Sequence, residues 1–61
     1  MINGSLGAVT YSVLWDLESQ VWRVADEMTG LYLVDDQDQP RAWDSFTIAW
    51  RDARTAERTA A

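Results

Sequence analysis

Carboxylates are the most numerous side chains in this sequence that could do chemistry. The 61 residues include ten Asp and Glu and five Arg, with no Lys, His or Cys. The chain therefore lacks the commonest metal ligand, any thiolate nucleophile and the bases that would activate its Ser and Thr hydroxyls. A single domain of this length also offers little concave surface for a substrate. We expect a protein that is not an enzyme.

The spacing that most resembles a metal site is that of Asp36 and Asp38, which stand at i and i+2 as in the opening of a calcium-binding loop. Pro40 and Arg41 stand where that loop needs a further oxygen ligand and a glycine, and Thr47 stands where it needs a bidentate Glu. We expect neither a metal site nor a cofactor.

The charges are divided unevenly along the chain. Residues 1–40 hold seven carboxylates and one cation, Arg23, whereas residues 41–61 hold three carboxylates and four Arg, so the two balances are −6 and +1. Because contacts with nucleic acid and anionic lipid need Lys and Arg, the net charge of −5 argues against direct binding to either. The N-terminus has no export signal, the longest apolar run is Leu31–Val34, and Cys is absent, so we expect a cytoplasmic protein and no membrane segment.

The elements that position these charges follow from the hydrophobic period. Three segments have the composition and alternation typical of strands, namely residues 9–18, 21–26 and 31–35. Short connections between them, with Gly30 free to take a positive φ in the second, favour an antiparallel meander over residues 8–36. We expect residues 1–7 to form a flexible leader.

Helical spacing replaces alternation in the last third of the chain. Phe46, Ala49 and Ala53 share one helical face, and Asp44 or Ser45 can serve as the N-cap, which predicts a helix over residues 45–60. The same region also alternates at Phe46, Ile48 and Trp50, so residues 41–50 could instead begin as a fourth strand before a shorter helix. The expected fold is one α+β domain over residues 1–61, a three-stranded antiparallel β-meander followed by one C-terminal helix packed on one face.

A meander of this kind would gather acidic side chains, because its first turn and the end of its third strand lie at the same end of the sheet. Five carboxylates would meet there: Asp16, Glu18, Asp35, Asp36 and Asp38. They are either solvated residues that provide solubility or a surface that binds a cationic partner, where complementary charge speeds encounter. Trp43 lies in a predicted loop and is the aromatic residue that we expect to touch a partner, whereas Trp15, Trp22 and Trp50 have core spacing.

Two other surfaces have a possible binding role. On the sheet face away from the core, a contiguous apolar patch would suit a homodimer or a docking surface, and its members are Leu14, Val21, Tyr32 and Val34. On the helix, Arg51, Arg54 and Arg58 form a cationic flank that is either solvated or able to bind phosphate.

Two resemblances bear on function. The segments Tyr11–Asp16, Val21–Asp26 and Thr29-Gly30 resemble small three-strand-plus-helix domains of the arm-type DNA-binding kind, but this chain has Asp and Glu where those families have Lys and Arg. In size, charge and lack of catalytic residues, the whole chain resembles short acidic inhibitor proteins of phages and mobile elements, including anti-CRISPR and DNA-mimic proteins.

The second resemblance implies a non-enzymatic inhibitor, in a bacterial cytoplasm, that occupies a basic nucleic-acid-binding surface of a partner protein. The five clustered carboxylates would then act as phosphate surrogates. The alternatives are a structural or adaptor module that homo-oligomerises through the outer sheet face and, as a third option, direct nucleic-acid binding by the Arg flank.

Overall fold

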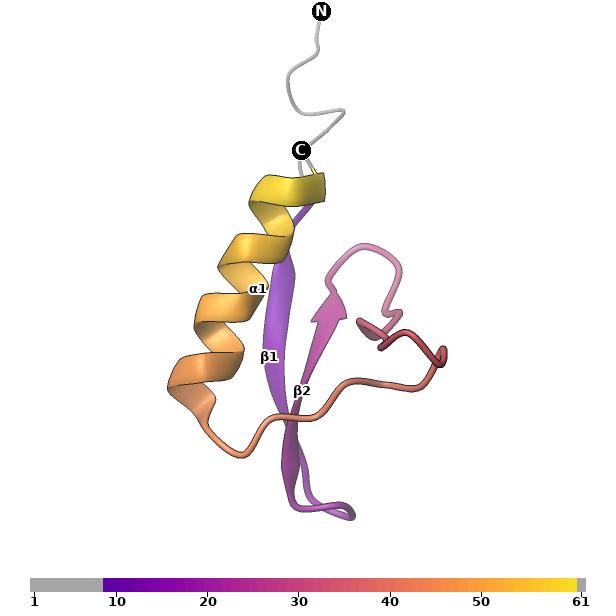
Figure 1. The fold of residues 1–61 in the computed structure, drawn as a ribbon, viewed down its shortest axis with the longest axis vertical. Coiled ribbons are helices and arrows are strands. Elements are labelled where there is room, and N and C mark those ends of the chain that lie inside the picture. Colours follow the sequence, from indigo (N-terminus) through magenta and orange to yellow (C-terminus); the bar gives the residue numbers. More distant parts are fainter. Residues whose placement is uncertain (1–8, 61) are drawn as a thin grey trace, which may run out of the picture.

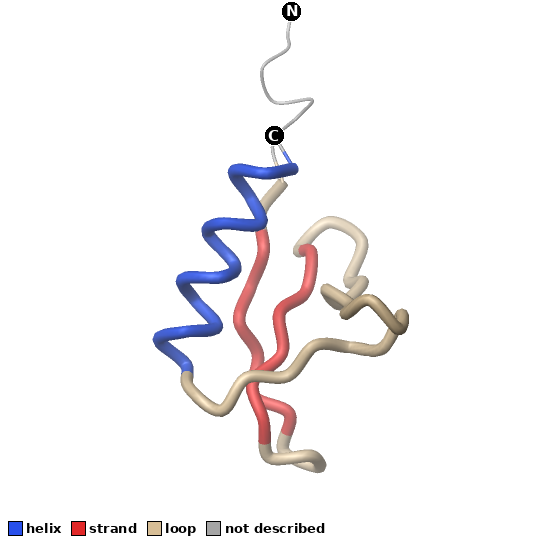
Figure 2. Tube along the Cα trace, viewed as in Figure 1, coloured by secondary structure: helices blue, strands red, loops and turns tan. Residues whose placement is uncertain are grey.

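The computed structural model describes residues 9–60, which form a two-stranded antiparallel sheet with one helix packed against it (Figure 1). Strands β1 (Tyr11–Asp16) and β2 (Val21–Asp26) come first, and helix α1 (Phe46–Ala60) comes last. The long connection between β2 and α1 turns back beside β2 before it crosses to the helix (Figure 2). The predicted leader over residues 1–7 lies outside the described residues.

The first two strands form where alternation predicted them. Tyr11, Val13 and Trp15 lie opposite Asp26, Val24 and Trp22 in the ladder. β2 has its predicted bounds, whereas β1 is shorter than the alternating run because its last residue starts a turn. There the Asp16 carboxylate accepts hydrogen bonds from the backbone N–H groups of Glu18 and Ser19, at 3.1 and 3.2 Å.

The prediction of a third strand over residues 31–35 is wrong, because the sheet has two strands. The returning chain pairs with β2 only at two isolated bridges, Ala25 with Tyr32 and Trp22 with Trp43. Between these bridges the chain leaves β2 and makes a loop over residues 34–40, which a bridge between Val34 and Pro40 closes. We call this loop the acidic loop.

Side-chain chemistry explains the interruption. The Asp35 carboxylate accepts hydrogen bonds from the backbone N–H groups of Gln37 and Gln39, at 2.9 and 3.0 Å, and so offers the backbone an alternative to the sheet ladder. Asp38 then takes a left-handed φ of 64°, and Pro40 has no N–H to donate to a neighbouring strand. A continuous strand cannot pass through these residues.

Helix α1 has close to its predicted bounds, and Ser45 is the cap. The Ser45 hydroxyl accepts a hydrogen bond from the N–H of Ile48, at 3.3 Å, and the described chain has no fourth strand over residues 41–50. None of the described helices is long and apolar enough to cross a membrane.

The core lies between the helix and the sheet. Ala49, Ala53 and Val24 are completely buried, and Trp43 is 8 % exposed. The helix thus contributes two small side chains, Ala49 and Ala53, to the buried core. Trp15 and Trp50, which were predicted to be core residues, are each 48 % exposed. Only Trp22, of the three, packs partly against the core.

Candidate functional site

The five predicted carboxylates lie on two separate loops. Asp16 and Glu18 belong to the β1–β2 turn, whereas Asp35, Asp36 and Asp38 belong to the acidic loop. In Figure 1 the turn lies at the lower end of the molecule, and the acidic loop projects sideways beyond β2. The expected gathering at one end of the sheet is therefore not found, because the chain leaves β2 after Leu33 instead of running alongside it to the turn.

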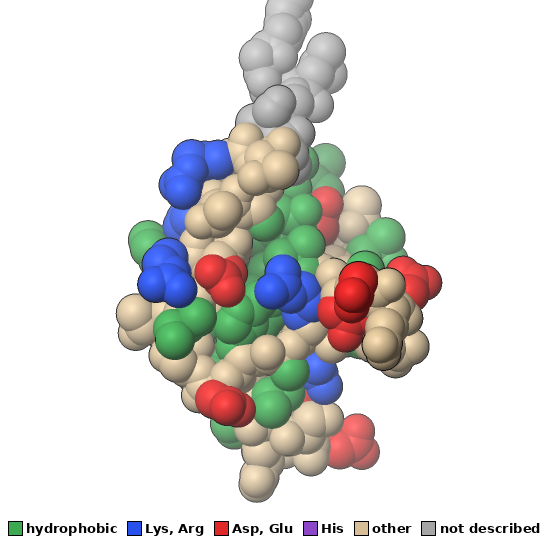
Figure 3. All heavy atoms as spheres, in the orientation of Figure 1, with side chains coloured by type: hydrophobic (Ala, Val, Ile, Leu, Met, Phe, Trp, Pro, Cys, Tyr) green, Lys and Arg blue, Asp and Glu red, His purple; other side chains and the backbone are tan. Residues whose placement is uncertain are grey.

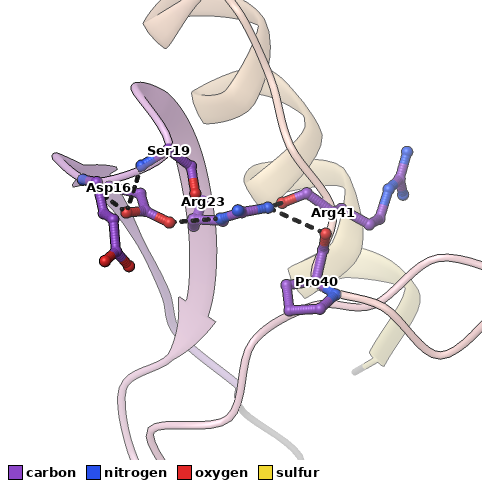
Figure 4. Close-up of polar contacts among 6 residues, drawn as sticks. Asp16, Ser19, Arg23, Pro40 and Arg41 are labelled. Carbon is purple, nitrogen blue, oxygen red and sulfur yellow. Dashed lines mark hydrogen bonds and ion pairs between the residues drawn. The ribbon is translucent and has the colours of Figure 1, made fainter.

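Arg23 joins these two loops (Figure 4). Its Nε donates to Asp16 Oδ2 at 3.1 Å, and its Nη1 donates to the carbonyl oxygens of Pro40 and Arg41 at 3.1 and 3.3 Å. The side chain is only 17 % exposed. The backbone N–H of Ser19 and then the Arg23 guanidinium lower the pKa of Asp16. The Asp16 carboxylate thus stays charged and binds groups of its own chain, namely Arg23 and the backbone of the turn.

Asp35 has a similar structural role in the acidic loop. Hydrogen bonds from the N–H of Gln39 and then of Gln37 lower the pKa of Asp35. Its own N–H donates to the Gln39 carbonyl at 2.8 Å, and its carbonyl accepts from the N–H of Asp38 at 3.0 Å. Asp35 therefore holds the loop in shape, and its Oδ1 accepts both of the backbone hydrogen bonds from Gln37 and Gln39.

Glu18, Asp36 and Asp38 are exposed and have no ion pair with any residue that the structure describes. Asp36 and Asp38 share the acidic loop, whereas Glu18 lies apart on the turn. Figure 3 shows acidic side chains gathered on the part of the surface that projects beside the sheet. Of the five predicted carboxylates, these three accept no hydrogen bond from the residues that the structure describes.

Trp43 is not an exposed loop residue. It exchanges two backbone hydrogen bonds with Trp22, at 2.8 and 3.0 Å, and its Nε1 donates to Asp52 Oδ2 at 2.8 Å. The Arg41 guanidinium lies 5.1 Å from its ring centroid. The expectation that Trp43 touches a partner is corrected by its burial in the core, which loop composition alone could not reveal.

The two alternative surfaces are less continuous than the sequence predicted. On the outer sheet face, Leu14, Tyr32 and Val34 are 41–46 % exposed and Val21 is half-buried. Arg23 lies directly opposite Leu14, and Asp16 opposite Val21, so an ion pair interrupts the apolar patch.

The Arg flank of the helix is also broken. The Nη2 of Arg54 donates to Glu57 Oε2 at 2.8 Å and to the Tyr11 carbonyl at 2.7 Å. The Nε of Arg51 lies 3.8 Å from Asp52 Oδ1. With Arg54 fixed against β1, the three side chains do not form a free cationic row for phosphate.

A row of aromatic rings was missed as a surface feature. The Trp15 and Trp22 rings lie 5.0 Å apart, and the Trp22 and Phe46 rings lie 5.1 Å apart, both edge to face. Trp15, Phe46 and Trp50 are each 48 % exposed. Their spacing matches that of core residues, so the sequence pattern alone did not show that each of them is half exposed.

A pocket of about 240 Å³ is lined by Arg41, Asp52, Thr55 and Ala56. Asp52 there accepts the Trp43 hydrogen bond, and the Thr55 hydroxyl donates to the Arg51 carbonyl at 3.1 Å. Among residues 9–60, no three carboxylates converge as metal ligands would.

The comparisons with known proteins add no relative. No protein-family model, curated protein or solved structure matches the chain.

Proposed function

We propose that this protein is a non-enzymatic acidic binding protein that occupies a basic, nucleic-acid-binding surface of a partner protein in the bacterial cytoplasm. The observation that supports this proposal is the exposure of the Asp36 and Asp38 carboxylates on an ordered loop. Both are exposed, neither has an ion pair among the described residues, and both stand on a loop that Asp35 holds in shape. A net charge of −5 surrounds them with a field of the same sign.

The acidic loop suits this task because its shape is set before binding. A flexible acidic segment would lose conformational entropy on meeting a partner, whereas a loop already closed by hydrogen bonds loses less. Fixed carboxylates can occupy positions that backbone phosphates would otherwise take, and complementary potential speeds their encounter with a basic groove. The partner's nucleic acid would be excluded while the groove is filled, which is how an inhibitor of the DNA-mimic type acts.

The roles of the five carboxylates differ in this proposal. Asp36 and Asp38 contact the partner, and Glu18 adds a third free charge on the turn. Asp16 and Asp35 act indirectly, because their oxygens hold the backbone of the two loops. Reversing the charge of Asp35 would therefore disturb the loop as well as its charge, so Asp35 is a poor test of partner binding.

The test compares two variants of equal charge. The loop variant is D36N/D38N, in which Asn tolerates the left-handed φ of residue 38, and the control is E27Q/D44N, which neutralises two exposed carboxylates elsewhere. Both have a net charge of −3. Immobilised wild-type and variant proteins are exposed to a bacterial lysate, and retained proteins are eluted with salt or with duplex DNA.

We expect duplex DNA to displace a protein that the wild type and E27Q/D44N both retain, and we expect D36N/D38N not to retain this protein. Equal retention by the two variants contradicts the proposal. So does retention that survives about 1 M salt, at which the Debye length is about 3 Å and exposed charge pairs are screened.

A further inference from the structure

The edge of β1 that faces away from β2 carries unpaired backbone groups. Trp22 exchanges both of its hydrogen bonds with Trp43, and the Val24 carbonyl accepts from Leu33, so these β2 groups point away from β1. The β1 residues opposite them, Trp15 and Val13, therefore form non-hydrogen-bonded pairs with β2. Their N–H and C=O groups point outward, to the free side of the sheet.

Among the described residues, helix side chains form hydrogen bonds with this edge at Tyr11. Tyr11, which points outward in the same way, donates its N–H to Glu57 Oε2 at 2.7 Å and accepts from Arg54 Nη2 at 2.7 Å. Glu57 and Arg54 thus take the place of a neighbouring strand at the start of β1. Within residues 9–60, no side chain or backbone group does the same for Val13 or Trp15. We call these four groups, two N–H and two C=O, the open edge.

Apolar surface borders the open edge. Phe46, Trp50, Arg54 and Glu57 recur at spacings of three and four residues, so they share one flank of α1. Because Arg54 and Glu57 contact β1 at Tyr11, this is the flank that faces the edge. Phe46 and Trp50 on this flank are half exposed, with the Phe46 ring packed edge to face on Trp22 of β2, and Trp15 contributes a third half-exposed side chain from β1 itself. An exposed edge strand with aromatic surroundings is a template for strand pairing.

We propose that a second copy of this chain pairs with the open edge, β1 against β1 in antiparallel orientation, to form one four-stranded sheet across a two-fold axis at Leu14. In this register Val13 of each copy exchanges two hydrogen bonds with Trp15 of the other, and the four bonds use all the groups of both open edges. A shift of two residues in one direction pairs Trp15 with Tyr11, whose backbone groups are already bound. A shift of two residues in the other direction pairs Val13 with Leu17, which lies beyond the end of β1.

The side chains fit this register. Leu14 meets its own symmetry mate on the outer face, Val13 meets Trp15 on the helix face, and Ser12 meets Asp16, so no like charges stand opposite each other. The edge from Tyr11 to Trp15 carries no charged side chain. The acidic loop lies beyond β2, at the edge of the sheet opposite to the open edge (Figure 1). Two copies of charge −5 therefore meet with their acidic loops far from the shared edge.

The available area indicates a dimer of modest affinity. Three aromatic rings that are half exposed offer roughly 300 Å² per copy, given about 150–250 Å² for a whole aromatic side chain. A standard interface buries about 800 Å² per partner. We therefore expect association that depends on concentration, with dimers at high concentration and monomers on dilution.

Two measurements on the full chain test the proposal. Sedimentation velocity over a dilution series gives the dimer dissociation constant for the wild type, L14K and V34K, with far-UV circular dichroism to confirm that each is folded. L14K places two like charges at the two-fold axis, and V34K places a charge at an equally exposed residue of the outer face. We expect L14K to raise the dissociation constant at least tenfold and V34K to leave it unchanged.

Amide hydrogen exchange reports on the edge directly and needs no substitution. The N–H groups of Val13 and Trp15 should exchange more slowly as concentration rises, whereas that of Tyr11, bound to Glu57 in each copy, should be protected throughout. A protein that stays monomeric at about 1 mM, where the binding free energy would be weaker than about −4 kcal/mol, overturns the proposal. A dimer that forms without protecting Val13 and Trp15, or that V34K disrupts as much as L14K does, also overturns it.

Discussion

The hydrogen bond between Trp43 and Asp52 should be a measurable part of the stability of this fold. It joins the segment before the helix to the helix itself, with Nε1 and Oδ2 2.8 Å apart. A hydrogen bond to a charged group contributes about 1.5–3 kcal/mol. Since the Asp52 side chain is 34 % exposed and partly hydrated, the lower end, about 1.5 kcal/mol, is the appropriate expectation.

A double-mutant cycle isolates this term. W43F keeps an aromatic ring in the core but removes the donor, D52A removes the acceptor, and the double variant removes both. The free energies of unfolding come from urea titrations at pH 7, followed by far-UV circular dichroism. We expect a coupling energy of about 1.5 kcal/mol, which corresponds to about 6–12 °C in melting temperature for a domain of this size.

The control cycle pairs D52A with W50F. Trp50 is two residues from Asp52 on the helix, so the two side chains do not face each other, and its ring lies near Arg54 instead. Its coupling to Asp52 should be within the usual additivity error of about 0.5 kcal/mol. A coupling energy for Trp43 and Asp52 that is no larger than this control would refute the structural role assigned to the bond.

Three further predictions concern the turn, the core and the acid response. The G30A substitution should lower the free energy of unfolding by about 1 kcal/mol, because residue 30 has a left-handed φ of +74° that strains an L residue, although no atom lies within 4 Å of the added Cβ. G30N should lower it less, because Asn tolerates this φ better than Ala does. Equal melting temperatures for the wild type and G30A would contradict this prediction. V24A should cost about 2 kcal/mol, from two buried methyl groups and the cavity they leave, as measured by urea unfolding. Since Asp16 and Asp35 have lowered pKa values in the folded protein, they contribute stability above their unfolded pKa of about 3.9, and this is lost as pH falls through the folded values. D35N should therefore make the melting temperature fall less steeply below about pH 4 than in the wild type.

Local patterns predicted the parts of the fold that depend on neighbours in sequence. Alternation located β2 at its observed bounds, and helical spacing located α1 to within one residue at its start. Gly30 has the positive φ expected of it, and Ser45 is the one of two possible caps that bonds to the helix. In each of these cases the deciding interactions span only a few residues, so a single sequence contains them.

The sequence-based predictions were wrong in two situations. In one, a side chain competed with the backbone hydrogen bonds of the sheet, and in the other, the core was too small to bury all the aromatic side chains. Leu31–Val34 has a strand-like composition, but Asp35 captures two backbone N–H groups and turns the chain away from β2. That departure also separated the two groups of carboxylates. Trp43 returned to β2 as a single bridge, which no periodicity in the sequence signals. Trp50 is half exposed because the buried face of the helix is centred on Ala49 and Ala53, and the sequence period alone does not fix which residues lie at the centre of that face.

The acidic loop interrupts the chain without changing which side chains point toward the core before and after it. If the chain continued from Tyr32 in the register set by Ala25, residue 35 would face Trp22, but Trp43 stands there, eight positions later. Because eight is even, side chains before and after the loop keep the same alternation, and Leu33 and Trp43 both contact the core. Arg23 holds the end of the loop through carbonyl oxygens, which any residue provides. A change in the length of the acidic loop by two residues would therefore keep Leu33 and Trp43 on the core face, whereas a change by one residue would turn one of them to the opposite face.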